Sequence, residues 1–425
     1  MIRTIVSVIR GEGIRSALRR GSDRTSDAIH AAAWRANGAF SANAEFDVLN
    51  VAASGMSPRL GGVQTQLVTR IHAERKLRNV AVLEPGVLHR FAPRHHTRSV
   101  AKDLASGIRE AIAITGAKTV HFEGMHNVPL EVALRLIDSG VDVIVSVHDF
   151  SLFCARPHLL EEPAGHFCFY SHDLDRCLRC LRQTWDVEND AQLTRRSLAR
   201  ELLNSAKGLI FPSQFLLDQH RRLFSLPELA AEVIEPGVQA PAIRTDANAR
   251  AIAFAGSVKR HKGAHLLPDL ARLLPDIDIH IFGGGDEDLL RSMRAIPNIS
   301  VHGYYRHGAL PTLLARHRIG LVVVPSIVPE SFGLVISESW IAALPVVAFD
   351  LGAQAERIRQ FGGGWIAPLE RGVVGLVEIV ERWRTGSITA NVPPVASTLE
   401  AAQAHVEVYR LTGVWPSAAR PYERA

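Results

Sequence analysis

The chain has 425 residues, enough for two domains of ordinary size with separate hydrophobic cores. Its composition, 47% hydrophobic and 21% charged, is that of a globular protein, and no apolar run reaches the roughly 18 residues of a membrane-spanning helix. Of the formal net charge of +5, the seven arginines and three acidic residues before Glu45 supply +4. The remainder is nearly neutral, which argues against nucleic acid as the main partner.

Residues 1–45 are predicted to form a basic, helical N-terminal extension. Its apolar stretch is short and lacks the small-residue cleavage site of a signal peptide, so we expect a cytoplasmic protein. The arginines, together with Ile5, Ile9 and Leu18, fit a helix that lies on an anionic membrane surface at the inner membrane face. Two glycines interrupt the apolar face, and the alternative is a solvated helix packed on the first domain.

From Phe46 onward, apolar runs alternate with amphipathic segments. The apolar runs predict strands at 46–52, 79–85, 117–124 and 141–149. The amphipathic segments predict helices at 63–76 and 129–140, and 206–222 adds one more strand and helix. This alternation indicates a parallel, doubly wound sheet, and we assign it to a first domain at 46–236.

A stretch without periodicity at 233–250 is the predicted linker, and the same alternation then restarts. Strands are predicted at 251–257, 277–285, 299–304, 319–326 and 345–350, with helices at 263–275 and 334–344. We therefore expect a second domain at 250–390, and a C-terminal segment, 391–425, that packs back on the first domain. Two Rossmann-like domains would face a cleft, and ligands would bind at the carboxyl ends of their strands.

The segment "VPSIVPESFGLVISESWIAALPVVAFD" places two carboxylates on either side of a tight turn. Glu330 follows an apolar strand, and Glu338 lies on the next helix in apolar company, where a carboxylate needs donors such as the two hydroxyls of a ribose. The turn between them opens the helix, whose free N–H groups suit a diphosphate. It consists of Ser331, Phe332, Gly333 and Leu334. The pattern indicates a nucleotide-sugar site, although this spacing also fits a plain exposed loop and helix.

Two further features of the second domain fit the same ligand. Lys262 stands just before Gly263 and a helix, where an ammonium group can meet a phosphate. Gly283, Gly284 and Gly285 end the following strand, where absent side chains let a ligand approach the backbone.

These motifs resemble glycosyltransferase family 4, the retaining enzymes with a GT-B fold. The resemblance covers Phe46 to about Ala367 and is strongest in the E-x7-E segment. It implies a donor nucleotide-sugar held by the second domain, with Glu330 on the transferred sugar, Glu338 on the ribose and Lys262 on the diphosphate. The backbone from Ser331 to Leu334 would contact the sugar and the phosphates.

The same resemblance extends to the first domain. "PRLGGVQTQL" resembles the family's glycine loop, which implies that Gly61 and Gly62 close on the phosphates from the other side. "VHD" resembles its strand-end histidine, which makes His148 a candidate for contact with the sugar near the reacting carbon.

The chain departs from the family pattern at two positions of the donor domain. Ser257 stands where the family usually has an arginine, which removes one charge from the diphosphate site. Lys259 and Arg260 are the nearby cations that could replace it. Ala353 stands where the family often has a second glycine. Ser257 and Gly285 complete the predicted donor contacts.

The expected reaction is transfer of a sugar to a hydroxyl acceptor with retention of configuration. The acceptor would be a glycan or a lipid-linked sugar in polysaccharide or glycolipid biosynthesis, and catalysis would need no metal cofactor. One alternative is a non-catalytic GT-B protein that binds a nucleotide-sugar or another enzyme, which Ser257 favours. Another is a nucleotide-sugar epimerase on the same fold.

All four cysteines lie in one window, 154–180, after the predicted histidine strand. They are Cys154, Cys168, Cys177 and Cys180, and they contain one C-x2-C pair. Four thiolates can complete a tetrahedral zinc site, so we predict a structural zinc ion. An iron–sulfur cluster and plain reduced cysteines are the alternatives.

Overall fold

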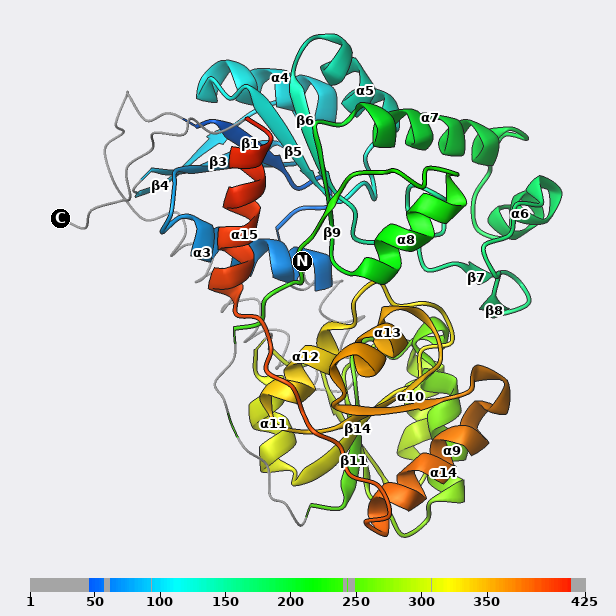
Figure 1. Ribbon diagram of the computed structural model, residues 1–425. Coiled ribbons are helices and arrows are strands. Elements are labelled where there is room, and N and C mark those ends of the chain that lie inside the picture. Colours follow the sequence, from blue (N-terminus) through cyan, green and yellow to red (C-terminus); the bar gives the residue numbers. More distant parts are fainter. Residues whose placement is uncertain are drawn as a thin grey trace, which may run out of the picture.

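The computed structural model describes residues 46–56, 62–92, 94–239, 243, 249–306 and 308–413. These residues form two lobes, one above the other in Figure 1. The predicted basic extension at 1–45, the glycine-loop residue Gly61 and the end of the C-terminal segment lie outside the described residues. No helix in the described ranges is long and apolar enough to cross a membrane.

The first lobe is built on an eight-stranded sheet. Its strands are β1 (Val48–Val51), β2 (Val80–Glu84), β3 (Val87–Ala92), β4 (Arg94–Ser99), β5 (Thr119–Glu123), β6 (Asp142–Ser146), β9 (Gly208–Phe211) and β10 (Glu232–Val233). They are arranged in the order β10-β9-β6-β5-β1-β2-β3-β4. The central strands β1 and β5 are buried along their whole length, as apolar strands covered on both faces must be.

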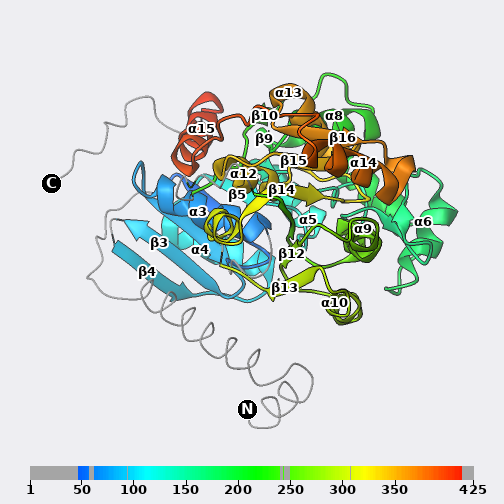
Figure 2. The ribbon, with the colours of Figure 1, turned by 90° about the horizontal axis from the view of Figure 1, so that it is seen from below.

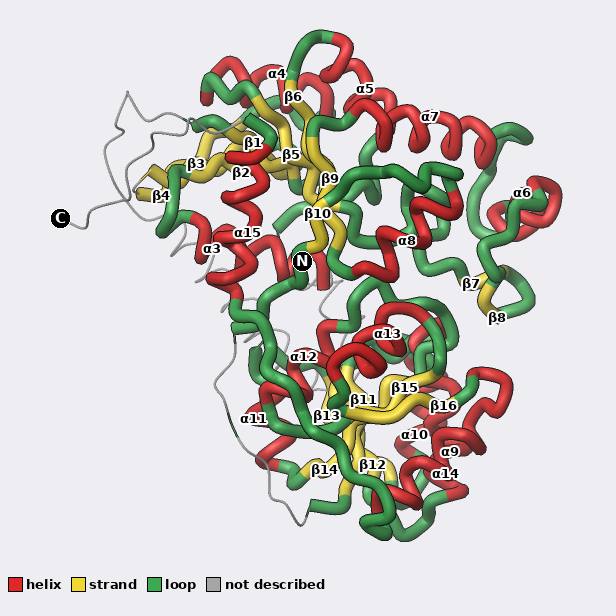
Figure 3. Tube along the Cα trace, viewed as in Figure 1, coloured by secondary structure: helices red, strands yellow, loops and turns green. Residues whose placement is uncertain are grey.

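Helices cover both faces of this sheet (Figure 3). They are α3 (Gly62–Glu74), α4 (Leu104–Thr115), α5 (Leu130–Asp138), α7 (Ala191–Ser205) and α8 (Gln214–Leu223). Ile108 of α4 and Leu202 of α7 pack into the main core, whereas Leu67 and Ile71 of α3 pack on the other face.

The sequence predicted a parallel sheet, but β3 and β4 are antiparallel to their neighbours. Only Pro85 and Gly86 separate β2 from β3, and a connection this short can only form a hairpin. Gly86 has a φ of +81°, which a glycine adopts without strain. Strands β3 and β4 pair as a second hairpin, the β3–β4 hairpin, which Figure 2 shows at one edge of the first lobe.

The segment that carries the cysteines lies at the opposite side of the first lobe from the β3–β4 hairpin (Figures 1 and 2). It connects β6 to α7. It contains the short strands β7 (Leu160–Glu161) and β8 (His166–Phe167), which pair with each other, and the helix α6 (Leu174–Leu181). We refer to residues 150–185 as the cysteine insertion.

The second lobe contains a six-stranded, fully parallel sheet. Its strands are β11 (Ala251–Ala255), β12 (Ile279–Phe282), β13 (Ile299–Gly303), β14 (Ile319–Val324), β15 (Val346–Phe349) and β16 (Gly364–Ala367). They are arranged in the order β13-β12-β11-β14-β15-β16, the strand order of a Rossmann sheet. The prediction of two Rossmann-like α/β domains is confirmed.

Helices also cover both faces of the second sheet. One face carries α9 (Leu267–Leu273), α10 (Glu287–Arg294) and α14 (Gly372–Arg384), and the other carries α11 (Leu310–Arg316), α12 (Leu334–Ile341) and α13 (Gly352–Phe361). Alternate residues of β14 enter the two cores: Leu321 and Val323 face α9 and α14, and Val322 and Val324 face α11 and α12.

The chain crosses between the lobes twice, and the two crossings touch. The Val238 amide donates to the Ala396 carbonyl at 3.0 Å, and Val238 forms a β-bridge with Ser397. A Cβ on Gly237 would lie 2.2 Å from the Ser397 carbonyl oxygen, so only glycine fits there. Figure 3 shows the returning loop running along the second lobe to reach the last helix.

That helix, α15 (Thr398–Leu411), belongs to the first lobe and packs against α3 (Figure 1). Ser397 and Glu400 begin it with a capping box. Tyr409 is fully buried, and its hydroxyl lies 2.8 Å from Nδ1 of His121 on β5. Arg70 of α3 donates to the same hydroxyl at 3.3 Å.

We expect Tyr409→Phe to lower the free energy of unfolding by about 1–3 kcal/mol, because it leaves the buried Nδ1 of His121 without this partner. Chemical denaturation of the full chain measures the change. Tyr304→Phe is the control, because Tyr304 is 76% exposed and its change should stay within about 0.5 kcal/mol. Equal effects from the two variants would contradict the stabilising role of the Tyr409 hydroxyl.

Candidate active site

The two central strands of the second sheet, β11 and β14, lie side by side, and the chain leaves them toward opposite edges. In an open α/β sheet this is the position where ligands bind, at the carboxyl ends of the strands. The turn that follows β11 carries Lys262, and the loop that follows β14 carries Glu330. The candidate active site is therefore at this point of the second lobe.

Lys262 and Glu330 form an ion pair across these two loops. Nζ of Lys262 lies 2.7 Å from both carboxylate oxygens of Glu330, and Ser326 donates its hydroxyl to the same carboxylate. Burial alone would raise the pKa of Glu330, but Lys262 and Ser326 bring this pKa below its ordinary value. Glu330 is thus ionised at neutral pH. Its negative charge balances the positive charge of Lys262, the residue that is predicted to meet a diphosphate.

Two glycines let the backbone fold this tightly around the ion pair. Gly263, which ends the 3₁₀ turn η2 (Arg260–Lys262), has a φ of +73°, and a Cβ there would lie 1.7 Å from the Pro325 carbonyl oxygen. Gly352 has a φ of +68°, and a Cβ there would lie 2.6 Å from the Glu330 amide nitrogen. Only glycine fits at either position.

The start of α13 holds the backbone of Glu330. The Glu330 amide donates to Oε1 of the buried Gln354 at 3.0 Å, and the Glu330 carbonyl accepts from the Ala353 amide at 2.9 Å. Ala353 stands where the resemblance has a second glycine, and its amide supplies this contact.

A buried arginine fixes the turn from Ser331 to Leu334. Nη1 of Arg357 donates to the carbonyls of Phe332 and Gly333 at 3.3 and 3.2 Å, and its guanidinium lies 3.9 Å from the centre of the Phe332 ring. Because a trans peptide directs its N–H opposite to its carbonyl, the amides of Gly333 and Leu334 point away from Arg357. These amides open α12, and an anion is the natural partner for them.

The first lobe contacts this turn directly. A Cβ on Gly62 would lie 3.0 Å from Cδ1 of Leu334, and the hydroxyl of Ser213, which caps α8, donates to the Ser331 carbonyl at 2.7 Å. The amide of Phe215 donates to Glu356 of α13 at 2.8 Å. The predicted residue Gly62 thus lies against the predicted turn, where the two lobes meet.

His148 follows β6 and lies beside the end of β5. A Cβ on Gly124 would be 3.5 Å from its ring. Burial lowers the pKa of His148 to about 4, with Asp149 opposing the shift, so the ring is neutral at pH 7. Within the described residues, no hydrogen bond or ion pair connects His148 with Glu330 or Lys262. Its proposed contact with a sugar stays a prediction.

Ser257 and Gly285 lie at neighbouring strand ends. Ser257 is exposed, and Gly285 forms a bridge with the next residue, Val258. A Cβ on Gly285 would lie 2.3 Å from the Val258 carbonyl oxygen, so backbone packing alone accounts for this glycine. Of the two cations that could replace the missing arginine, Arg260 donates through Nε to the Gly165 carbonyl at 2.9 Å, and Lys259 is exposed.

Glu338 lies on α12 and is only 4% exposed. Burial raises its pKa from 4.5 to about 7, although a hydrogen bond from the Gly308 amide opposes the shift. An ionised carboxylate at this position is costly unless further donors reach it. A ligand that supplies hydroxyl groups would meet that need.

Sequence reasoning did not identify the residues that support the site. Ser326, Gln354 and Arg357 lie on the loop after β14 and on α13, and all three are buried. Gln354 and Arg357 lie three positions apart on α13, about one helical turn, and this spacing is the signal that the sequence offers for them.

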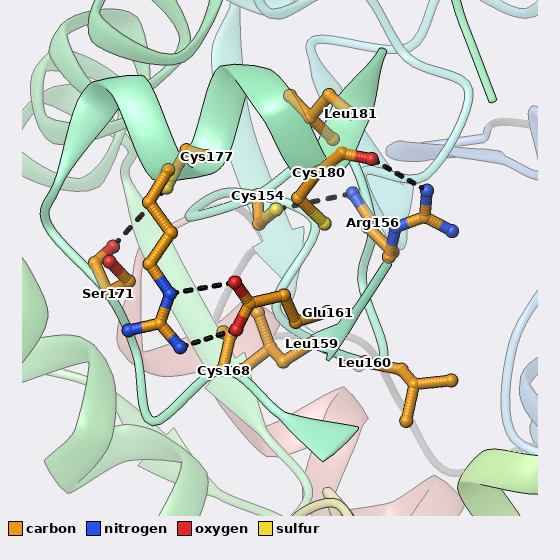
Figure 4. Close-up of a pocket in the computed structure, with 11 residues that line it drawn as sticks. Cys154, Arg156, Leu159, Leu160, Glu161, Cys168, Ser171, Cys177, Cys180 and Leu181 are labelled. Atoms are coloured by element: carbon orange, nitrogen blue, oxygen red, sulfur yellow. Dashed lines mark hydrogen bonds and ion pairs between the residues drawn. The ribbon is translucent and has the colours of Figure 1, made fainter. Parts of the chain in front are cut away.

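The four cysteines line one small cavity in the cysteine insertion, with a volume of about 20 Å³ (Figure 4). Their sulfur atoms do not form a close group of metal ligands in this structure. Within the described part of the chain, the potential ligand atoms that all lie within 4.8 Å of one another belong instead to His280, His302 and His317. Sequence reasoning assigned no role to this group, which lies on β12, β13 and the end of α11.

Comparison with known proteins locates the similarity in the second lobe and in the fold. Residues 239–390 match the model of the family described as glycosyl transferases group 1. No curated protein sequence matches the chain.

Among solved structures, similar folds include sucrose-phosphate synthase from Thermosynechococcus elongatus. It is 15% identical, with a TM-score of 0.60, and the match covers 86% of this chain and 98% of that one. Anabaena Alr3699/HepE in complex with UDP-glucose is 17% identical, with a TM-score of 0.56 and coverage of 86% and 98%. A glycosyltransferase from Rickettsia africae is 15% identical, with a TM-score of 0.54 and coverage of 87% and 98%. At these identities the matches show the two-domain GT-B fold.

We expect Gly263→Ala to lower the free energy of unfolding by more than about 3 kcal/mol. The alanine would have to adopt the left-handed backbone conformation of Gly263, and its Cβ would clash with the Pro325 carbonyl oxygen. Gly116→Ala is the matched control. Gly116 also ends a helix, with a φ of +70°, but no heavy atom lies within 4 Å of the added Cβ, so the loss should be about 1–2 kcal/mol. Denaturant titration compares the two, and similar losses would mean that the close approach at Gly263 is absent.

We expect Glu338→Gln to become more stabilising as the pH rises. The folded protein holds the Glu338 proton up to about pH 7, whereas the unfolded chain loses it near 4.5, so the stability of the wild type falls between these values. The glutamine variant escapes this loss, which amounts to at most about 3 kcal/mol. Unfolding of both proteins at about pH 5 and pH 8, without ligand, measures the difference. Glu370→Gln, at an exposed site, should show none.

Proposed function

We propose that the protein is a glycosyltransferase that binds a nucleotide-sugar donor in the second lobe and transfers the sugar to a hydroxyl acceptor. The observation that carries the proposal is the Lys262–Glu330 ion pair, placed at the switch point of a Rossmann sheet beside a turn with outward amides. The family match over 239–390 supports it. The similar fold of a protein solved with UDP-glucose is consistent with such a donor.

In this proposal each part of the donor meets one element of the site. The diphosphate lies against the amides of the 331–334 turn and the ammonium of Lys262, and Gly62 approaches from the first lobe. The ribose hydroxyls donate to Glu338, and these hydrogen bonds offset the cost of ionising its carboxylate in a buried position. Glu330 then accepts from hydroxyls of the sugar.

The proposed chemistry is substitution at the anomeric carbon with retention of configuration. As the bond to the nucleoside diphosphate breaks, negative charge grows on the phosphate oxygens, where Lys262 and the turn amides stabilise it. Glu330 and Glu338 do not serve as the acid and nucleophile of a hydrolase, because both would contact hydroxyl groups of the donor instead of flanking the scissile bond. No metal is needed for this step.

The finer parts of the proposal concern the acceptor. We expect the first lobe, with His148 at its cleft edge, to hold the hydroxyl of a glycan or a lipid-linked sugar. The basic residues 1–45 would bring the protein to the inner face of a membrane, where such acceptors are found. The activity would then be that of a hexosyltransferase in polysaccharide or glycolipid biosynthesis.

Calorimetric titration of the full chain with UDP, GDP, ADP and their common sugar conjugates tests the donor site. We expect one nucleotide series to bind, and both Lys262→Ala and Glu338→Ala to weaken it about tenfold to a hundredfold, since each removes a charge-assisted hydrogen bond. Lys118→Ala and Glu370→Ala, at exposed sites, are the matched controls.

If no nucleotide binds at millimolar concentration, the donor site is wrong and a non-catalytic role is the better explanation. If a series binds but the conjugate is converted to another nucleotide-sugar without an acceptor, the protein is an epimerase.

A further inference from the structure

We infer that Cys154, Cys168, Cys177 and Cys180 bind one zinc ion, and that the cysteine insertion which this ion holds together fixes the Arg260–Lys262 turn at the donor site. The first half of the inference stands on the insertion alone. The second half rests on the proposed function, because it gives the turn its role.

Hydrogen bonds of the insertion are directed at its sulfurs. The amide of Arg156 donates to Cys154 at 3.4 Å, the amide of Glu162 donates to Cys180 at 3.2 Å, and the amides of Tyr170 and Ser171 donate to Cys168. The guanidinium of Arg196 lies 3.5 Å from the sulfur of Cys177. A neutral thiol is a weak acceptor, whereas a metal-bound thiolate carries charge that such donors stabilise.

The cavity among these sulfurs suits a single ion that prefers sulfur. Its volume of about 20 Å³ leaves room for one ion-sized occupant. The charged side chains of the lining are already paired: Arg176 and Glu161 with each other, and Arg156 with Thr184, to which it donates at 2.8 Å. A water molecule would find few polar partners there, so thiophilic zinc is the better occupant.

Figure 4 shows the four cysteines coming from separate parts of the insertion: Cys177 and Cys180 from one helix, and Cys154 and Cys168 from loops. Zinc binds thiolate sulfurs at about 2.3 Å, so its binding would bring the four sulfur atoms closer to one another than they are in this structure. Besides α6, the insertion has little regular structure, since β7 and β8 contain two residues each, but Phe153, Leu159 and Phe167 pack into the main core of the first lobe. Four bonds to one ion would add to this packing by tying α6 to the loops of Cys154 and Cys168.

The insertion touches the donor site at two points. Arg260 donates through Nε to the Gly165 carbonyl at 2.9 Å. The rings of His158 and His261 are stacked, with centroids 4.7 Å apart and planes within 1° of parallel. His261 and Arg260 are the two residues directly before Lys262, so the contacts act on the turn that carries the predicted phosphate ligand.

The contact continues into the loop of Glu330. The His261 carbonyl accepts from the Ile327 amide at 3.1 Å, three residues before Glu330. Zinc, insertion, lysine turn and glutamate loop thus form one chain of direct contacts. The zinc ion is a structural element of the first lobe that positions a binding element of the second.

Metal analysis of the purified full chain, after growth with zinc, tests the first half. We expect about one zinc per chain in the wild type and in His302→Ala, and none in the double variant Cys177→Ser/Cys180→Ser. Zinc that is lost in His302→Ala but retained in the cysteine variant would assign the ion to the three histidines and overturn the inference.

Cobalt keeps the test independent of whether the cysteine variant folds. Co²⁺ added to metal-free wild type should give the near-ultraviolet absorption of thiolate-to-cobalt charge transfer, and its absence would overturn the site.

Hydrogen exchange tests the second half without any nucleotide. Removal of zinc from the wild type by a chelator should speed the exchange of amides in 258–263, and added zinc should restore it, while peptides of α14 stay unchanged. Unchanged exchange in 258–263 would separate the ion from the donor site. Since none of these measurements uses a nucleotide, a failure of the donor titration would not be mistaken for a failure of the zinc site.

Discussion

The ion pair between Lys262 and Glu330 is the constraint around which the second lobe is arranged. Removal of Lys262 alone is costly, because the Glu330 carboxylate, whose side chain is only 13% exposed, would lose its cation. The surrounding residues hold the pair in place: Gly263 and Gly352 permit the close backbone approaches, and Gln354 fixes the loop amide. A ligand that takes Lys262 must therefore offer Glu330 other donors, and sugar hydroxyls are such donors.

The first lobe has its own network of buried charges. Arg70 of α3 is paired with Glu123 at the end of β5 and with Glu74, and Glu74 is paired with Arg78. Burial raises the pKa of Glu123 to about 7, although Arg70 opposes the shift. Glu123 directly precedes Gly124, which touches His148, so this network supports the first-lobe edge of the cleft. The Tyr409 hydroxyl of α15 completes it.

Periodicity predicted the two Rossmann-like domains, because alternating strands and helices leave a clear pattern in the sequence. Of the residues that the motifs singled out, Lys262 and Glu330 lie side by side in the structure, and the donor role of these residues stays a prediction. The β3–β4 hairpin was missed because strand β4, "RHHTRS", is polar and has no apolar run. Arg357 and Gln354 were missed because their partners, Phe332 and Glu330, become neighbours only when α13 packs beside the turn. The contact between His158 and His261 joins residues more than 100 positions apart, and no local pattern indicates it.

The return of the chain to the first lobe has a consequence for its synthesis. Helix α15 covers α3 and supplies Tyr409, yet it follows the entire second lobe in the sequence. During translation the first lobe lacks α15, which covers Arg70, Glu74 and Arg78 in the folded protein, until the second lobe has been synthesised. The second lobe is continuous and can fold first. The first lobe, although it precedes the second in the sequence, is thus the one completed last.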